Sequence, residues 1–183
     1  MSGFEKGDAA VKKPDEVVQK NDSPPQFEGT DSRQAAQANL RNDLLDKGIM
    51  PALNAKDVPA TAAQAAEAMA NRDLGFPSDG NKSSGTAVSR LLQASGLDIR
   101  VTPAIPDLKH QLEEKGFKAS ELQPGEKPKP GDVIFTSMDP VGRNVGIVGD
   151  DGKIYSHNFG RKEFVGQEKW TSKFTTVMRP GDS

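Results

Sequence analysis

At 183 residues the chain is long enough for one domain of ordinary size with an appendage. Its 24 Lys and Arg against 26 Asp and Glu give a formal net charge of −2, and no basic stripe interleaved with aromatic residues is present. This pattern excludes a nucleic-acid or anionic-membrane partner. The complete lack of cysteine excludes disulfides, cysteine-bearing zinc sites and a thiol nucleophile.

The beginning of the chain shows no recognisable targeting segment. Residues 1–8 lack the apolar centre of a secretory signal, and no stretch approaches the length of about eighteen apolar residues that a membrane span needs. We therefore expect a protein that is made in the cytoplasm and that is exported, if at all, by a non-Sec route or carried by a phage.

The first third of the chain is polar and poor in aromatic residues. Phe4 and Phe27 are the only aromatic residues before Phe76, and no sustained apolar period occurs up to about residue 58. Residues 1–58 are therefore predicted to form a flexible polar arm, with a weak helix over residues 32–45. Such an arm suits a tether, or a docking segment for a partner or delivery protein.

Helical patterns begin where the folded domain, residues 59–183, is expected to start. An alanine-rich helix is predicted over residues 59–71, with Thr61 as its cap and Gly75 as its stop. After a loop, a second helix is predicted to begin at residue 84 or 85 and to end at 95, and a third to span residues 106–115.

Beyond the third helix the apolar period changes to that of strands. Short runs separated by Gly, Asp and Pro predict about five strands in an antiparallel meander. These runs are Val133–Phe135, Asn144–Val148, Lys153–Asn158, Glu163–Val165 and Phe174–Met178. Helices followed by strands predict an α+β domain.

Three motifs follow one another in a distinctive order. Residues 84–96 read SGTAVSRLLQASG, residues 130–135 read PGDVIF, and NVGIVG at 144–149 is followed by IYSHN at 154–158. In this order and at these distances the motifs resemble the NlpC/P60 group of papain-like cell-wall peptidases. The resemblance covers about residues 62–180.

The resemblance implies a papain-like α+β fold, in which N-terminal helices pack on a five- to six-stranded antiparallel barrel-like sheet. It also implies hydrolysis of an amide bond in the stem peptides of bacterial peptidoglycan, through an acyl-enzyme and without a cofactor or metal. The domain would then act as an amidase or endopeptidase, in an interbacterial effector or a phage lysis component.

The nucleophile position of the family falls on a serine. In the family a cysteine opens the helix, where free backbone N–H groups favour a thiolate and an oxyanion. The spacing to Val88, Leu92 and Gly96 selects Ser84, with Ser83 as the close alternative. A serine before a helix is also the commonest cap, so capping is the competing structural interpretation.

The histidine position of the family reads Asn144, and a histidine stands instead on the next strand, at His157. With two-residue loops, both possible hairpin registers place Asn144, Gly146 and His157 on one face of the sheet. We therefore hypothesise that His157 is the general base and Asn144 its orienting partner, with Ser84 as nucleophile. A shift of the base by one strand, roughly 5 Å, weighs against this arrangement.

Substrate contacts are expected from four residues around this constellation. These are Ser83, Asp79 in the preceding loop, Gly146 and Tyr155.

Three other features have simpler interpretations. His110 lies on a polar helix face and is expected to be solvated, Asp150 and Asp151 are expected to form a turn, and Trp170 is expected to pack one end of the barrel.

Three interpretations of the substituted site remain. The parent protein is a cysteine hydrolase whose nucleophile is replaced here, or it is a pseudoenzyme that binds wall peptides or a protein partner, or Ser84 is itself a working nucleophile.

Overall fold

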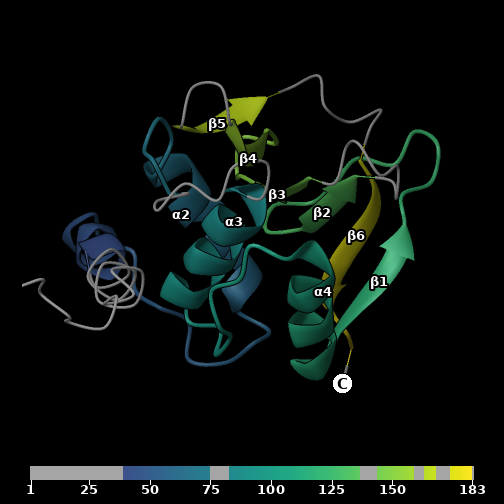
Figure 1. The fold of residues 1–183 in the computed structure, drawn as a ribbon, viewed down its shortest axis with the longest axis horizontal. Coiled ribbons are helices and arrows are strands. Elements are labelled where there is room, and N and C mark those ends of the chain that lie inside the picture. The colour runs from purple at the N-terminus through teal and green to yellow at the C-terminus, as the bar shows by residue number, and fades with distance from the viewer. Residues whose placement is uncertain (1–38, 75–82, 137–143, 159–162, 168–173, 183) are drawn as a thin grey trace, which may run out of the picture.

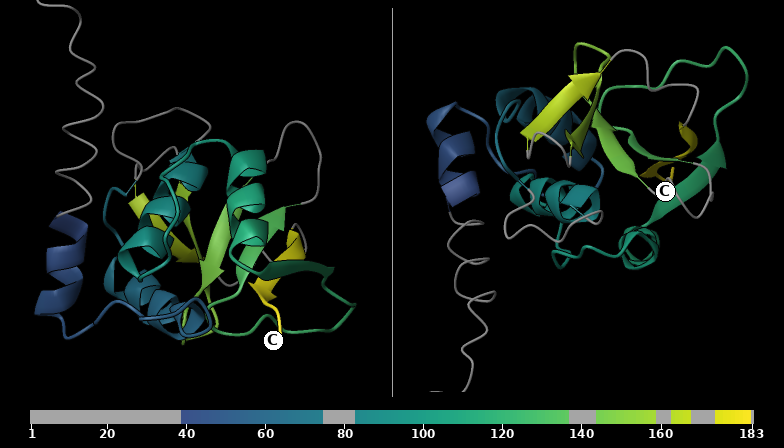
Figure 2. Two further views of the ribbon diagram at one scale, coloured as in Figure 1. Left: turned by 90° about the horizontal axis from the view of Figure 1, so that it is seen from below. Right: turned by 45° about the horizontal axis from the view of Figure 1, so that its top comes forward.

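The computed structural model describes residues 39–74, 83–136, 144–158, 163–167 and 174–182, with the backbone alone for Ser83, Asn158 and Phe174. These residues form an α+β domain in which helices cover one face of a twisted antiparallel sheet (Figures 1 and 2). Within the described ranges, every helix is too short or too polar to cross a bilayer.

The helices follow the predicted positions closely. They are a helical segment over residues 39–46, α2 (Val58–Ala68), α3 (Ser83–Ala94) and α4 (Ile105–Glu114). The predicted cap of α2 is wrong, because the helix begins three residues before Thr61, with Asp57 at the N-cap position and Pro59 in the first turn, where its missing N–H costs nothing. The predicted stop, Gly75, lies outside the described residues.

The end of α3 is fixed by Gly96 in the left-handed conformation. Leu97 N–H donates to Leu92 O at 3.0 Å and Gly96 N–H donates to Gln93 O at 3.1 Å, which is the paired pattern of a Schellman motif. Gly96 has a φ of +108°, and a Cβ there would lie 2.3 Å from the carbonyl oxygen of Ala52. The glycine therefore ends the helix and allows the segment before α2 to pack closely against it.

Six antiparallel strands form one sheet in the order β1-β6-β2-β3-β4-β5. The strands are β1 (Phe117–Glu121), β2 (Val133–Thr136), β3 (Val145–Val148), β4 (Ile154–Asn158), β5 (Glu163–Gln167) and β6 (Phe174–Pro180). The predicted meander holds for β2 to β5, whereas β6 returns to pair with both β2 and β1. The sheet is open, with β1 and β5 at its edges, so the expected barrel-like closure is not seen among these strands.

Strand β1 was not predicted from the sequence. Of its five residues only Phe117 is buried, and the other four are exposed. It lacks the alternation of a half-buried strand, because it is an edge strand paired with β6 along one side only.

The two faces of the sheet carry separate apolar clusters. The larger one joins the helices to the sheet through side chains such as Val133, Phe135, Val145 and Ile147. Alternate residues along the same strands point the other way and form a smaller cluster, Ile134, Val148, Ile154 and Val177. This alternation decides which face each candidate site residue occupies.

The packed part of the chain begins earlier than the expected boundary at residue 59. Leu40 and Leu44, on the helical segment 39–46, are 4% and 1% exposed and belong to the larger cluster. Their burial joins residues 39–58 to the domain, since apolar side chains at positions i and i+4 of a helix face the same side. Residues 1–38 lie outside the described part of the chain.

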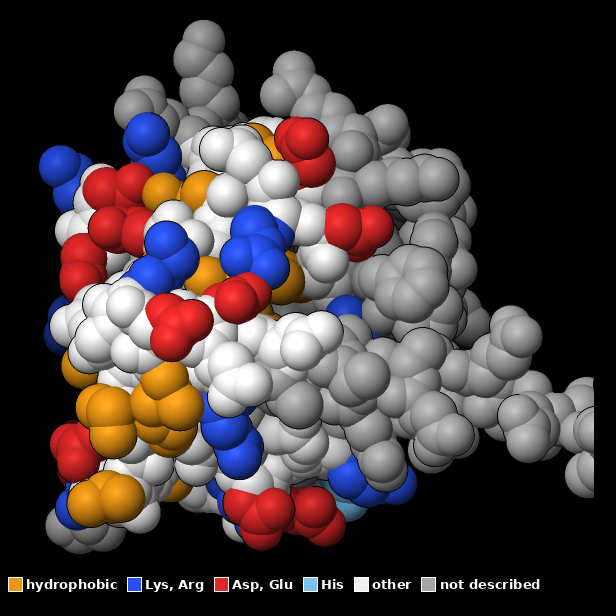
Figure 3. Space-filling view, turned by 90° about the vertical axis from the view of Figure 1, so that its left-hand side faces the viewer, with side chains coloured by type: hydrophobic (Ala, Val, Ile, Leu, Met, Phe, Trp, Pro, Cys, Tyr) orange, Lys and Arg blue, Asp and Glu red, His pale blue; other side chains and the backbone are white. Residues whose placement is uncertain are grey.

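Three large apolar side chains near this segment stay in solvent. Leu45, Met50 and Leu53 are 39%, 67% and 100% exposed. The space-filling view of this side of the molecule shows its largest group of hydrophobic side chains at the lower left, with charged side chains scattered over the rest of the described surface (Figure 3). Leu40 and Leu44 therefore anchor the helical segment, while Leu45 on it and Met50 and Leu53 after it stay exposed.

The PGD motif forms a turn in which Asp132 is hydrogen-bonded to both the backbone and Arg179. Asp132 Oδ2 accepts the backbone N–H of Lys129 at 2.7 Å, and Arg179 holds both carboxylate oxygens of Asp132, each at 2.7 Å. This bidentate hydrogen bond raises the pKa of the Arg179 guanidinium. The motif is thereby explained by structure: it ties the start of β2 to β6.

Candidate functional site

Ser84 lies in the first turn of α3, where the sequence placed the nucleophile. The residue is 4% exposed, and its Oγ has no hydrogen-bond partner among the described residues. A cap would accept a backbone N–H bond from the helix, so the capping interpretation is not supported for Ser84. Ser83 begins the helix, but its side chain lies outside the described residues.

The start of α3 is held rigidly against the segment before α4. Ser89 Oγ donates to Gly85 O at 2.7 Å and accepts the backbone N–H of Thr102 at 3.0 Å. A Cβ on Gly85 would lie 2.7 Å from the carbonyl oxygen of Pro103, so only glycine fits between the two segments. Ser84 is therefore carried on backbone that has little freedom to shift.

His157, on β4, is buried on the helix-covered face. Its side chain is 3% exposed, and its Nε2 lies 3.0 Å from Oδ1 of Asp73. The other ring nitrogen, Nδ1, is buried without a hydrogen-bond partner in the described part of the chain. Helix α3, which carries Ser84, packs against β4 and β3. The structure therefore places Ser84 Oγ and His157 Nδ1, two polar atoms without a partner among the described residues, on neighbouring elements.

Asp73 is the functional candidate that the sequence did not reveal. It follows α2 and stands 84 residues before His157 in the chain. No motif marks it, since an isolated Asp between a helix and a loop is among the most ordinary of surface residues. Only the folded chain shows that this carboxylate meets the histidine.

The predicted register of the β3–β4 hairpin is wrong. Ile147 pairs with Tyr155 and Val148 with Ile154, so Val145 falls opposite His157. The loop has three residues rather than two: Gly149 N–H donates to Lys153 O at 2.9 Å, and Gly152 takes a left-handed φ of +79°. One extra loop residue moves every side chain of β4 to the opposite face relative to β3.

Asn144 is consequently not the partner of His157. Its Oδ1 accepts the backbone N–H of Val145 at 3.0 Å and lies 3.0 Å from the hydroxyl of Ser156. Ser156 and His157 are successive residues of β4 and point to opposite faces. The expected His–Asn pair is therefore replaced by a His–Asp pair.

The remaining substrate-contact candidates have structural roles or fall outside the description. Gly146 pairs across from Ser156, and a Cβ there would lie 2.7 Å from the side chain of Ile154, so it belongs to the face opposite His157. Asp79 lies outside the described residues, as does Trp170.

Tyr155, expected to contact substrate, lies on the same face of β4 as His157 and is packed into the core. It is 6% exposed and stacks on Phe164 with ring centroids 5.9 Å apart, and its hydroxyl donates to Asp151 Oδ2 at 2.7 Å. Burial raises the pKa of the Tyr155 phenol well above its ordinary value, and the bond to Asp151 adds to this effect. Tyr155 thus ties the hairpin tip to the core.

Two further predictions are confirmed. His110 is exposed on α4 and lies 3.3 Å from the Glu114 carboxylate one turn on, and Asp151 sits in the β3–β4 turn, where its Oδ1 accepts the Lys153 N–H at 3.0 Å. Among the described residues no group of three or more His, Asp or Glu is arranged to hold a metal ion.

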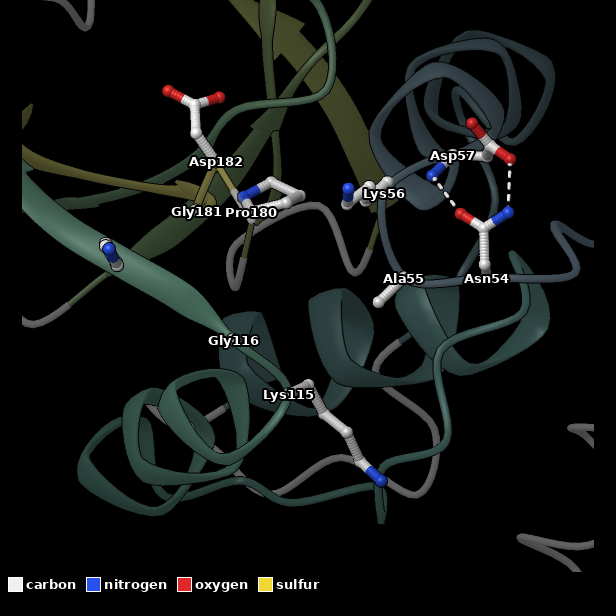
Figure 4. Close-up of a pocket in the computed structure, with 10 residues that line it drawn as sticks. Asn54, Ala55, Lys56, Asp57, Lys115, Gly116, Pro180, Gly181 and Asp182 are labelled. Carbon is white, nitrogen blue, oxygen red and sulfur yellow. Dashed lines mark hydrogen bonds between the residues drawn. The ribbon is translucent and has the colours of Figure 1, made fainter.

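A hollow of about 530 Å³ lies away from these residues. It is bounded by the segment 54–57, the turn between α4 and β1, and the end of β6 (Figure 4). Ser84 and His157 are not among the residues that line it, and its charged lining residues are Lys56, Asp57, Lys115, Lys118 and Asp182. Side chains of both charge signs therefore line the hollow, and it lies apart from the residues that the sequence singled out.

No family model, curated protein or solved structure matches the chain. What the protein does must therefore be inferred from the geometry of Ser84, His157 and Asp73.

Proposed function

We propose that the chain is a papain-like hydrolase domain of the NlpC/P60 type that cleaves an amide bond in peptidoglycan stem peptides, as an amidase or endopeptidase. The observation that supports it is the pair of buried atoms Ser84 Oγ and His157 Nδ1, which have no hydrogen-bond partner among the described residues and lie on packed elements. A buried polar atom without a partner costs about 1 to 3 kcal/mol, so a nucleophile and a base that stay unsatisfied within the described residues are candidates for a chemical role.

The proposed reaction uses this chain's own groups throughout. Ser84 Oγ attacks the carbonyl carbon of the substrate amide and its proton passes to His157 Nδ1, while N–H groups at the start of α3 stabilise the oxyanion. The C–N bond then breaks as that proton moves to the leaving amine, and a water molecule releases the acyl group from Oγ. The polar N-terminal region would serve delivery, either in an effector or in a phage particle.

The experiment that tests this proposal is turnover of purified muropeptides, followed by mass spectrometry. The chain is compared with its Ser84→Cys form, with Ser83→Cys as the matched variant one residue earlier on α3, and with His157→Gln in each background. Cleavage that requires His157 and that is enhanced by Ser84→Cys supports the proposal, since a thiol is the stronger nucleophile. Cleavage restored by Ser83→Cys alone would move the nucleophile by one residue.

A second candidate is a pseudoenzyme that binds wall peptide or a protein partner through the same region. No hydrogen bond joins Ser84 to His157, and the two residues are only 4% and 6% exposed. Both observations favour this second candidate. If none of the variants cleaves, while the chain cosediments with intact peptidoglycan sacculi, the binding function replaces the hydrolytic one. If it neither cleaves nor cosediments, both peptidoglycan functions are excluded.

A further inference from the structure

The contact between His157 and Asp73 fixes the roles of the two ring nitrogens. A carboxylate can only accept hydrogen bonds, so Nε2, which lies 3.0 Å from Asp73 Oδ1, carries the proton and donates it. In the neutral ring Nδ1 then has the lone pair and no hydrogen. This is the nitrogen that is buried without a partner among the described residues.

Asp73 is held in place by backbone contacts on both sides. Asn71 N–H donates to Phe164 O and Phe164 N–H donates to Arg72 O, both at 2.7 Å, so the residues before Asp73 are joined to β5. Phe164 is itself the residue paired with His157 across β4 and β5. The backbone of Phe164 therefore helps to position both the Asp73 carboxylate and the His157 ring.

A buried arginine secures the other side of Asp73. Arg90, on α3, is 2% exposed, and its guanidinium donates to Leu74 O at 2.6 Å. Hydrogen bonds from a charged donor are among the stronger ones in proteins. The same helix thus carries Ser84 and fixes the segment that bears Asp73, which ties the nucleophile position to the partner of the histidine.

Stability alone does not account for this pair. The Asp73 side chain is 41% exposed, so water can solvate its carboxylate without the ring, and a contact that solvent reaches adds less to folding than a buried one. A histidine held only for packing would also be expected to satisfy both ring nitrogens once buried. The arrangement instead prepares one nitrogen as an acceptor and uses the other to hold the ring.

We propose that Asp73 is the positioning residue of this site: it selects the Nε2–H tautomer of His157 and so presents Nδ1 as the base. This inference rests on the proposed function for its catalytic consequence, but the tautomer itself is a property of the folded chain. Asp73 replaces the Asn144 of the sequence-based hypothesis.

The test is the ¹⁵N spectrum of the imidazole ring in alkaline buffer, where an ordinary imidazole is neutral. The chain has two histidines, so a His110→Gln background leaves His157 as the single ring observed. Asp73→Ala is compared with Asp43→Asn, which removes the ion pair with Arg72 next to Asp73 without touching His157. We expect the Nε2–H tautomer alone in the parent and in Asp43→Asn, and a mixture of tautomers in Asp73→Ala.

Activity gives a second, separate readout. In whichever form of the chain cleaves muropeptides, Asp73→Ala is expected to lower kcat by about 100-fold or more with little change in KM, and Asp73→Glu to recover part of the loss. A parent ring protonated on Nδ1, or a spectrum unchanged by Asp73→Ala, would overturn the proposal whatever the activity. A chain that cleaves nothing but shows the expected spectra would instead overturn the hydrolytic function and leave the positioning role standing.

Discussion

Asp132 in the turn at the PGD motif and Ser84 at the start of α3 are both buried polar residues, yet they differ in whether their polar atoms have hydrogen-bond partners. At the turn, the buried Asp132 carboxylate is satisfied by Arg179 and by a backbone N–H. At the helix start, Ser84 Oγ and His157 Nδ1 are buried with no partner in the described ranges. The PGD motif therefore has a structural explanation within this chain, whereas no contact in the described ranges explains the polar groups at the helix start.

The largest expected effect comes from disrupting the close packing of the PGD turn. Gly131 has a φ of +84°, and a Cβ there would lie 2.2 Å from Pro59 O, whereas Gly125 has nearly the same φ, +81°, and no atom within 4 Å of a Cβ. Both Ala variants should lose about 1 to 2 kcal/mol to the left-handed backbone, and Gly131→Ala a further 1 to 3 kcal/mol or so to overpacking against α2. Guanidinium denaturation measures both.

Equal losses at the two glycines would contradict the close packing of this turn on α2. The PGD motif would then specify only a local backbone shape.

A smaller effect on stability is expected from the serines of α3, where Ser89 is hydrogen-bonded and Ser84 has no partner among the described residues. Ser89→Ala leaves the buried Thr102 N–H without its acceptor and should cost about 1 to 3 kcal/mol of unfolding free energy. Ser84→Ala removes a hydroxyl that has no partner among the described residues and should change stability by less than about 0.5 kcal/mol in either direction. Urea denaturation of the two variants, each matched to the parent, provides the measurement.

If Ser84→Ala is as destabilising as Ser89→Ala, Ser84 has a structural partner and the contrast between the regions fails. A Ser84→Ala variant that keeps the stability of the parent but abolishes turnover would strengthen the contrast between the two regions.

The smallest effect is the pH dependence of stability that Glu126 contributes through its contacts with Gln123 and Arg179. The backbone N–H of Gln123, and after it Arg179, lower the pKa of the exposed Glu126 carboxyl from its ordinary value of 4.5. A depressed folded-state pKa stabilises the fold above pH 4.5, and this contribution is lost as the pH falls through the folded value. Glu126→Gln should therefore lower the urea midpoint slightly at neutral pH and leave it unchanged in strong acid.

Glu121→Gln on the exposed edge strand β1 is the matched control, since Glu121 forms no ion pair within the described part of the chain. An equal loss at both positions, or a loss that persists in acid, would contradict the role of Glu126 at the turn.

Much of the fold follows from signals that act over a few residues. Glycine at position 96 ends α3, glycine at 116 follows α4, and the apolar runs of β2 to β6 fall where strands form. Each signal depends on local backbone preference or on a short period of apolar side chains, both of which a single sequence displays. The α+β class and the placement of Ser84 at a helix start could therefore be predicted.

The partners of the site could not be predicted in this way. The face occupied by His157 depends on whether the hairpin loop holds two or three residues, and Asp73 meets His157 across 84 residues of chain. The placement of β6 between β1 and β2 is equally remote in sequence. The sequence by itself determined most of the elements and the placement of Ser84 at a helix start, because these rest on short-range backbone energetics. The tertiary structure decided the histidine's face and its acidic partner, because loop closure and packing between distant segments have no local signature.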